Sequence, residues 1–374
     1  MMQPPLDRAP SQPKLGLLCA LSALLAACGA DPKSQEEHLG TSRSAITLTF
    51  SNSGTSTTVV STAMPTVNVT NGTQPFTCSI LTNNSGGAGC TVTGNVVSYT
   101  PGPNAYYAIK NQRYGDYLKL VSASGGPYLQ SGGTFGSDLF AMAASGSGFT
   151  FRSKSNSNYL RSAGTVSTGN NLVADVAAAA SASVFLRSDC NPAGTYNRFG
   201  FASQTGTNKY WQQKATPTST VDTVNNGGGS CSGSNAGAWE AFYLEPATDT
   251  LRITGSAGAN VGDVTVFVEY PIAFMPTSTS AAPSTAISAV QAWGGNSQFT
   301  GGSAGCTVTT NASGGAGTCS VTGLGVVSYT PGAAAGTDVI RVADSHGHAG
   351  TFNVTSFQAL MLVLAMTVGT GRRI

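Results

Sequence analysis

The sequence predicts an all-β chain in which a three-fold repetitive domain is inserted into the first of two related modules. The composition is typical of short strands joined by turns, because Gly occupies 47 of 374 positions and only 9% of residues are charged. One segment occurs twice. A different strand-turn-strand pattern occurs three times, between the first copy of that segment and the strands that complete it.

The N-terminus predicts export. Residues 1–27 form a leader whose apolar run, Leu15 to Ala27, is too short to span a membrane as a mature helix. The run closes with Leu25-Ala26-Ala27-Cys28-Gly29, which resembles the lipobox of bacterial lipoproteins. That resemblance implies cleavage before Cys28 and lipid attachment to it, so that the chain contacts a membrane through the anchor. An ordinary cleavage site with an incidental cysteine is the alternative.

The segment that follows predicts a flexible tether. Residues 28–45 are polar and show no apolar periodicity. Gly29 and Ala30 differ from the Asp signal that retains some lipoproteins at the inner membrane. The resemblance therefore implies an outer-membrane or cell-surface location.

The cysteines indicate an oxidising compartment. Of eight, Cys19 leaves with the leader and Cys28 takes the lipid. An even remainder in an exported protein favours three disulfides over zinc, since no close CxxC pair is present. The six that remain are Cys78, Cys90, Cys190, Cys231, Cys306 and Cys319.

An internal repeat predicts the nesting. Asn83–Gly102 reads NNSGGAGCTVTGNVVSYTPG, and Asn311–Gly332 reads NASGGAGTCSVTGLGVVSYTPG. The second copy continues directly into an alternating strand at Thr337, whereas the first resumes only at Thr248. We therefore expect a guest domain in an exposed loop of the first module. The expected boundaries are 46–105 with 247–270 for the first module, 106–246 for the insert and 271–356 for the second module.

The two modules resemble bacterial immunoglobulin-like domains, in which an Asp-Ser-x-Gly turn precedes the last strand. Here that turn is Asp344-Ser345-His346-Gly347. The resemblance implies β-sandwiches. Corresponding positions in the two copies predict the pairs Cys78–Cys90 and Cys306–Cys319, each closing a short loop.

The insert predicts a trefoil of six barrel strands and three cap hairpins. Its repeated pattern is an apolar strand, a polar turn and an aromatic-led strand: Ile109 to Tyr117-Leu118-Lys119, Phe151 to Tyr159-Leu160-Arg161, and Phe201 to Tyr210-Trp211-Gln212. With the closing Trp239-Glu240-Ala241-Phe242, it resembles fascin-like β-trefoils, which include actin cross-linkers and carbohydrate-binding modules. The loops of the third unit could be stapled by Cys190 and Cys231.

Composition and motifs argue against catalysis, cofactors and nucleic acid. A net charge of +2 offers no basic footprint, and the acidic residues show no pairing at motif spacing. His346 and His348 follow Asp344 in one turn, which suggests a metal site or a Ser/His/Asp set. These residues lie consecutively on one hairpin, and the first module has Gly255–Ala259 instead. We therefore expect neither a metal site nor a catalytic residue.

The functional expectation is a non-catalytic envelope protein whose trefoil binds a polysaccharide on an immunoglobulin-like stalk. Aromatic faces beside amides suit saccharides, and we expect Trp211 to be an exposed stacking residue. Trp211 aligns with Leu118 and Leu160 of the other units, so a larger core residue is the alternative. The alternative is a structural or adhesive protein that binds a protein partner or no ligand. The tail, 357–374, is apolar but shorter than a spanning helix, and its role stays open. The expected ligand residues are Trp211, Gln212, Tyr107, Tyr114 and Tyr128.

Overall fold

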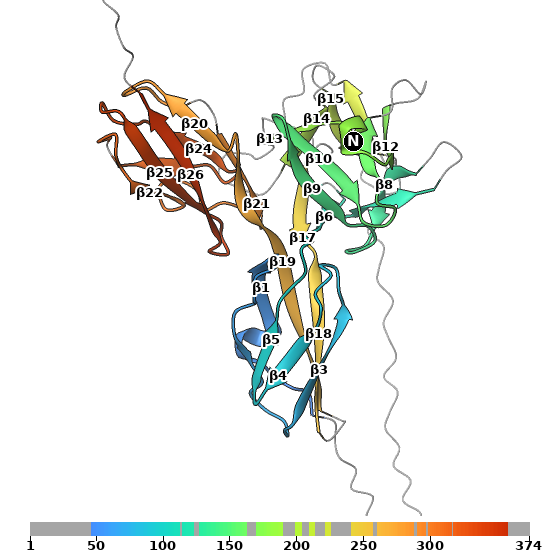
Figure 1. Ribbon diagram of the computed structural model, residues 1–374. Helices are drawn as coiled ribbons and strands as arrows, with labels where there is room; N and C mark the ends of the chain where they lie inside the picture. The colour runs from blue at the N-terminus through green and yellow to red at the C-terminus, as the bar shows by residue number, and fades with distance from the viewer. Residues whose placement is uncertain are drawn as a thin grey trace, which may run out of the picture. The chain divides into compact units, whose positions relative to one another are not determined.

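The chain is all-β, as the composition predicts (Figure 1). In the part of the chain that the structure describes, every regular element is a strand apart from two short 3-10 helices, η1 (Ser51–Gly54) and η2 (Ala179–Ser181). No helix among the residues described is long and apolar enough to cross a membrane. The computed structural model describes residues 46–112, 114–122, 127–162, 170–189, 199–203, 209–213, 221–225, 241–256, 260–287, 290–296, 298–315 and 317–357.

Several expectations fall on other parts of the chain. The leader, Cys28 and the tether, the Cys190–Cys231 pair and nearly all of the tail lie outside the described residues. Each of them stays a prediction.

The first module consists of two sheets around one core. In the first sheet, β1 (Thr55–Val59) pairs in parallel with the long strand β19 (Val261–Met275). Strand β19 also pairs with β18 (Thr248–Gly255), which in turn pairs with β3 (Phe76–Thr82). The core between the sheets includes Val97, Ile253 and Val264. The first sheet contains β1 (Thr55–Val59), β19 (Val261–Met275), β18 (Thr248–Gly255) and β3 (Phe76–Thr82), and the second contains β2 (Val67–Asn68), β5 (Val96–Tyr99) and β4 (Cys90–Thr93).

The second module repeats this arrangement. Strand β20 pairs in parallel with β26, as β1 pairs with β19. One sheet contains the end of β19 with β21 (Val290–Gly295), β24 (Val326–Tyr329) and β23 (Cys319–Val321), and the other contains β20 (Ser278–Ala281), β26 (Ala349–Ser356), β25 (Gly336–Ala343) and β22 (Cys306–Thr310).

A disulfide links the two sheets in each module. Cys78 in β3 is bonded to Cys90 in β4, with 5.7 Å between their Cα atoms. Cys306 in β22 is bonded to Cys319 in β23, with 5.6 Å between the Cα atoms. Both predicted pairings are confirmed.

Strand β19 belongs to both modules. Its residue Glu269 is the last to pair with β1, opposite Val59, and the next residue, Tyr270, pairs with Gly295 of β21. The expected boundary between residues 270 and 271 therefore lies inside a continuous strand. No loop separates the modules at this point.

Twelve strands between the two halves of the first module form a separate sheet. They fall into three units of four. The first and fourth strands of each unit pair in a closed ring, β6-β9-β10-β13-β14-β17 and back to β6. The first unit contains β6 (Tyr107–Asn111), β7 (Tyr117–Val121), β8 (Tyr128–Gly133) and β9 (Phe140–Ser145). The second contains β10 (Gly148–Ser153), β11 (Tyr159–Ser162), β12 (Asn170–Val176) and β13 (Phe185–Asp189), and the third contains β14 (Phe199–Ser203), β15 (Lys209–Gln213), β16 (Val221–Asn225) and β17 (Phe242–Pro246).

The ends of this segment lie side by side. Its first and last strands are antiparallel, with Tyr107 opposite Pro246. Strand β3, before the segment, pairs with β18, after it, over Phe76–Thr82. The chain therefore leaves the first module after β5, in one sheet, and returns to it at β18, in the other sheet, with the two ends of the intervening segment side by side.

Candidate functional site

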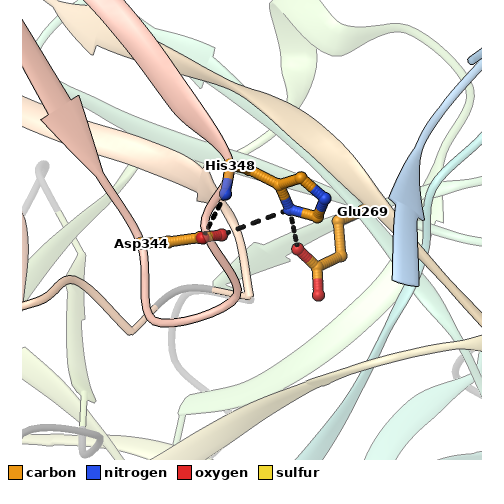
Figure 2. Close-up of side chains that lie close together, drawn as sticks. All are labelled: Glu269, Asp344 and His348. Carbon is orange, nitrogen blue, oxygen red and sulfur yellow. Dashed lines mark hydrogen bonds and ion pairs between the residues drawn. The ribbon is translucent and has the colours of Figure 1, made fainter. Parts of the chain in front are cut away.

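Among the described residues, a group of ionisable side chains lies where β19 passes between the modules. Here the junction cluster denotes Glu269, Asp344 and His348, which Figure 2 shows, together with His346. The Nδ1 atoms of His346 and His348 lie 2.8 and 2.9 Å from the two carboxylate oxygens of Glu269. The same Nδ1 of His348 lies 3.4 Å from Oδ2 of Asp344. Two imidazoles and two carboxylates therefore converge.

The turn between β25 and β26 fixes Asp344. Its Oδ1 accepts hydrogen bonds from the backbone N–H groups of His346 and His348, at 3.0 and 2.8 Å. An Asp side chain that accepts from the backbone two residues later is the usual origin of such a turn. Gly347 has a φ of +87°, a conformation that glycine adopts without steric cost. The local sequence thus places both histidines beside the carboxylate.

Burial and charge perturb the titration of the cluster. Hydrogen bonds to Asp344 and Glu269 raise the pKa of His348 to about 9, despite its partial burial. The hydrogen bond to Glu269 also raises the pKa of His346. Burial raises the pKa of Asp344, but the bonds from His348 and the backbone outweigh it, so this pKa is lowered. The carboxylates of Glu269 and Asp344 are both fully buried.

The cluster differs from the arrangement that the sequence suggested. Its Asp and His residues do lie on one hairpin, but Glu269 joins them from a strand 75 residues upstream of Asp344. No sequence motif surrounds Glu269, so only the fold could reveal it. The Ser345 hydroxyl accepts a hydrogen bond from the Asn296 amide at 2.6 Å, and among the described residues no hydrogen bond joins Ser345 Oγ to a histidine.

The expectation that Trp211 is exposed is wrong. Its side chain is fully buried, as are Leu118 and Leu160 at the corresponding positions of the other units. Its ring contacts those of Phe151, Phe185, Phe201 and Phe242, with centroids 4.8 to 6.0 Å apart. A core tryptophan cannot stack on a ligand. The alignment of Trp211 with two leucines was the available signal for this role.

The other expected ligand residues do not form one surface. Tyr107 is fully buried, and its hydroxyl donates to the carbonyl of Gly295 at 2.9 Å, so it is not available to a ligand. Tyr114 and Tyr128 are half-buried. The side chain of Gln212 lies outside the described ones.

A different aromatic group does reach the surface of the insert. Here the aromatic patch denotes Lys110, Tyr117, Phe135 and Glu245. Phe135 is 42% exposed, and its ring meets the Tyr117 ring edge-on, with centroids 5.6 Å apart. Lys110 Nζ lies 5.1 Å from the centroid of the Tyr117 ring and 3.6 Å from Glu245 Oε1. An aromatic surface thus adjoins one positive and one negative group.

Hydrogen bonding holds this patch in place. The Tyr117 hydroxyl donates to Glu245 Oε2 at 2.5 Å, and burial with this bond raises the pKa of the phenol. A hollow of about 330 Å³ adjoins the charged end of the patch. Its lining is mainly polar and consists of Lys110, Asn111, Gln112, Gly115, Tyr243, Leu244, Glu245 and Gln298.

No protein-family model and no curated protein sequence matches the chain. Among solved structures it is similar to Drosophila N-cadherin EC1-4, at 11% identity over 82% of this chain and 73% of that one, with a TM-score of 0.18. It is also similar to the N-terminal four Ig domains of Dscam1 isoform 7.44, at 7% identity over 84% and 73%, with a TM-score of 0.19. It is similar as well to protocadherin Gamma B2 extracellular cadherin domains 3-6, at 9% identity over 85% of this chain and 72% of that one, with a TM-score of 0.17. These values identify no family.

Proposed function

We propose that this chain is a non-catalytic binding protein of the cell envelope, held by lipid on Cys28, whose insert binds a polysaccharide. In this proposal residues 106–246 are a fascin-like β-trefoil carried by the first of two immunoglobulin-like modules. The three units of four strands and the closed ring of pairing support the trefoil. The adjoining ends of the insert support its display from a host loop.

The aromatic patch is the observation that carries saccharide binding. A sugar ring presents an apolar face edged by hydroxyl groups, so it is recognised by an aromatic surface with polar groups beside it. Phe135 offers the exposed surface, and Lys110 and Glu245 offer a donor and an acceptor next to it. The polar hollow extends the same surface with backbone and amide groups. We therefore assign the proposed saccharide-binding site to the aromatic patch and not to Trp211.

A glycan array with the purified chain tests the proposal. We expect binding to one saccharide class, and we expect Phe135→Ala to weaken it at least tenfold without loss of folding. Phe357→Ala is the matched control, because Phe357 is also an exposed phenylalanine, at 50%, but lies at the end of β26. Equal binding by both variants would move the site elsewhere. Absence of binding across a broad array would favour a protein partner or no ligand.

A second variant separates folding from binding. Trp211→Ala should destabilise the insert by about 3 to 5 kcal/mol, because it empties the centre of an aromatic core. Binding per folded molecule should be unchanged. Denaturant unfolding followed by saccharide titration of the folded fraction measures the two effects separately.

A further inference from the structure

We propose that the junction cluster is a binding site for a divalent transition-metal ion of the zinc class. Three atoms, Glu269 Oε2, Asp344 Oδ2 and His348 Nδ1, all lie within 4.8 Å of one another (Figure 2). His346 lies outside this group of three, with its Nδ1 2.8 Å from the other oxygen of Glu269, so the fourth position of a tetrahedral ion is left to water. The three donors come from strand β19 and from the turn between β25 and β26.

The two buried carboxylates are paired with histidines in this structure, and a divalent cation could take the place of the histidine protons. The carboxylates of Glu269 and Asp344 are both fully buried, and buried charges require a partner. Among the described residues, every ion pair of Glu269 and Asp344 is with a histidine. Imidazoles that ligate a metal are neutral. One divalent ion would therefore balance the two carboxylates.

The spacing of the donors fits a small coordination sphere. A tetrahedral zinc ion with bonds of about 2.0 to 2.1 Å separates neighbouring ligand atoms by about 3.3 Å. His348 Nδ1 and Asp344 Oδ2 are 3.4 Å apart, and His348 Nδ1 and Glu269 Oε2 are 2.9 Å apart. Only the Glu269 carboxylate has to withdraw by a few tenths of an ångström. The turn would stay as it is.

The surroundings orient the donors. Asp344 is held by backbone N–H groups of His346, His348 and Asn296, the last at 3.1 Å from Oδ2. Such hydrogen bonds to a ligating carboxylate set its direction toward a metal. The side chain of His346 is 40% exposed, so the cluster is open to solvent on that side. Ions can therefore reach it.

The donor types select the class of ion. Imidazole nitrogen with carboxylate oxygen suits zinc and its neighbours in the first transition row, whereas calcium and magnesium favour oxygen alone. A bound ion would tie the Asp344–His348 turn of the second module to β19. It would do so at Glu269, where the pairing of β19 passes from β1 to β21. The ion would thus stiffen the connection between the modules.

Calorimetric titration of the purified chain with zinc, without a histidine tag and after treatment with a chelator, tests this proposal. We expect one ion per chain with a dissociation constant in the micromolar range or below, unaffected by millimolar calcium or magnesium. Cobalt should give the visible absorption of a four-coordinate site. Saturating zinc should raise the melting temperature by about 4 °C or more.

The chain offers a matched control, because it contains only three histidines. His348→Ala should abolish the zinc-dependent rise in melting temperature, and His38→Ala should leave it intact. Glu269→Gln keeps the side-chain shape and should lower the affinity at least tenfold, which keeps the test valid if His348→Ala fails to fold. Absence of stoichiometric binding, or binding that His38→Ala removes and both other variants retain, would overturn the proposal and leave the cluster a hydrogen-bonded contact only.

Discussion

The two sandwich modules contain the same buried polar group but differ in their connections. In the first module, Asp249 accepts hydrogen bonds from the hydroxyls of Ser85 and Tyr99, at 2.5 and 2.6 Å. In the second, Asp338 accepts the corresponding bonds from Ser313 and Tyr329, at 2.6 and 2.7 Å. Both carboxylates are fully buried. The serine and the tyrosine of each group lie in the repeated segment, and the aspartate lies in a later strand, β18 or β25.

In each module the backbone of one glycine packs closely against the serine of this buried group. Gly102 and Gly332 each donate their N–H to the serine hydroxyl of the group, at 2.9 and 2.6 Å. A Cβ at Gly102 would lie 2.3 Å from the carbonyl oxygen of Ser85, and one at Gly332 would lie 2.2 Å from that of Ser313. Both positions therefore require glycine, which explains the shared Ser-Tyr-Thr-Pro-Gly sequence.

The segments that connect the strands differ between the two modules, although the buried polar group is the same in both. Between Gly102 and Asp249 the first module carries the twelve-stranded insert, whereas the second module carries only a short loop between Gly332 and Asp338. The turn that precedes the last strand also differs, since only the second module has Asp344 and two histidines there. The comparison indicates that the carboxylate group holds the sandwich, and that the loops around it are free to acquire other roles.

The largest effect should follow from removing either carboxylate. Asp249→Ala and Asp338→Ala should each cost about 3 to 5 kcal/mol, because a buried serine, tyrosine and backbone N–H would lose their acceptor. Urea unfolding measures both. The control is Asp263→Ala, which breaks an exposed pair with Arg252 and should cost about 1 kcal/mol or less. Costs that differ by more than about 2 kcal/mol between the modules would refute their equivalence.

Removing the disulfides should have a smaller and matched effect. The two bonds close loops with sequence separations of 12 and 13 residues. Replacing Cys78 and Cys90 by alanine, or Cys306 and Cys319, should destabilise the affected module by about 3 kcal/mol in each case. Thermal unfolding under non-reducing conditions tests this. A loss in only one module would show that the bonds are not equivalent.

The hydroxyl groups of Tyr99 and Tyr329 should contribute still less to the free energy of unfolding, and their contribution should depend on pH. Burial and the hydrogen bond to Asp338 raise the pKa of Tyr329 to about 12. A raised pKa means that the stabilisation is complete below the unfolded value of about 10 and is lost as the pH rises through about 12.

Tyr329→Phe should therefore cost about 1 kcal/mol at neutral pH and lessen the alkaline loss of stability. Tyr99→Phe should behave alike, since burial and Asp249 raise the pKa of Tyr99. Unfolding curves between pH 8 and pH 12 give the comparison. If both variants lost stability at alkaline pH as the unaltered protein does, groups other than these two tyrosines would be responsible for that loss.

The smallest effect should follow from making the first module resemble the second. Replacing residues 103–247 by Ala333–Gly336 gives the first module its sibling's loop. We expect the stability of that module to change by about 1 kcal/mol or less, because the folded insert already holds its two ends side by side and so closes the host loop as a short connection would. Retention of the Cys78–Cys90 bond and of cooperative unfolding supports the nested arrangement. Loss of both would mean that the insert is part of the module's core.

The sequence by itself determined the features that repeat. The two copies of the Gly-Gly and Ser-Tyr-Thr-Pro-Gly segment predicted the paired cysteines that the structure bonds, because equivalent chain positions in one module are equivalent in space. The strand-turn-strand pattern that leads to Tyr117, Tyr159 and Tyr210 likewise marks hairpins that the structure contains. The all-β class followed from composition and turn chemistry alone.

Tertiary structure decided which side chains are buried and which distant ones meet. Trp211 belongs to an amphipathic pattern that fits either a core or a surface, and only the closure of the strand ring places it among four phenylalanine rings. Glu269 looks like an ordinary charged residue in a strand. It reaches His346 and His348 because β19 runs on from one sandwich into the next, a long-range contact that no local pattern encodes.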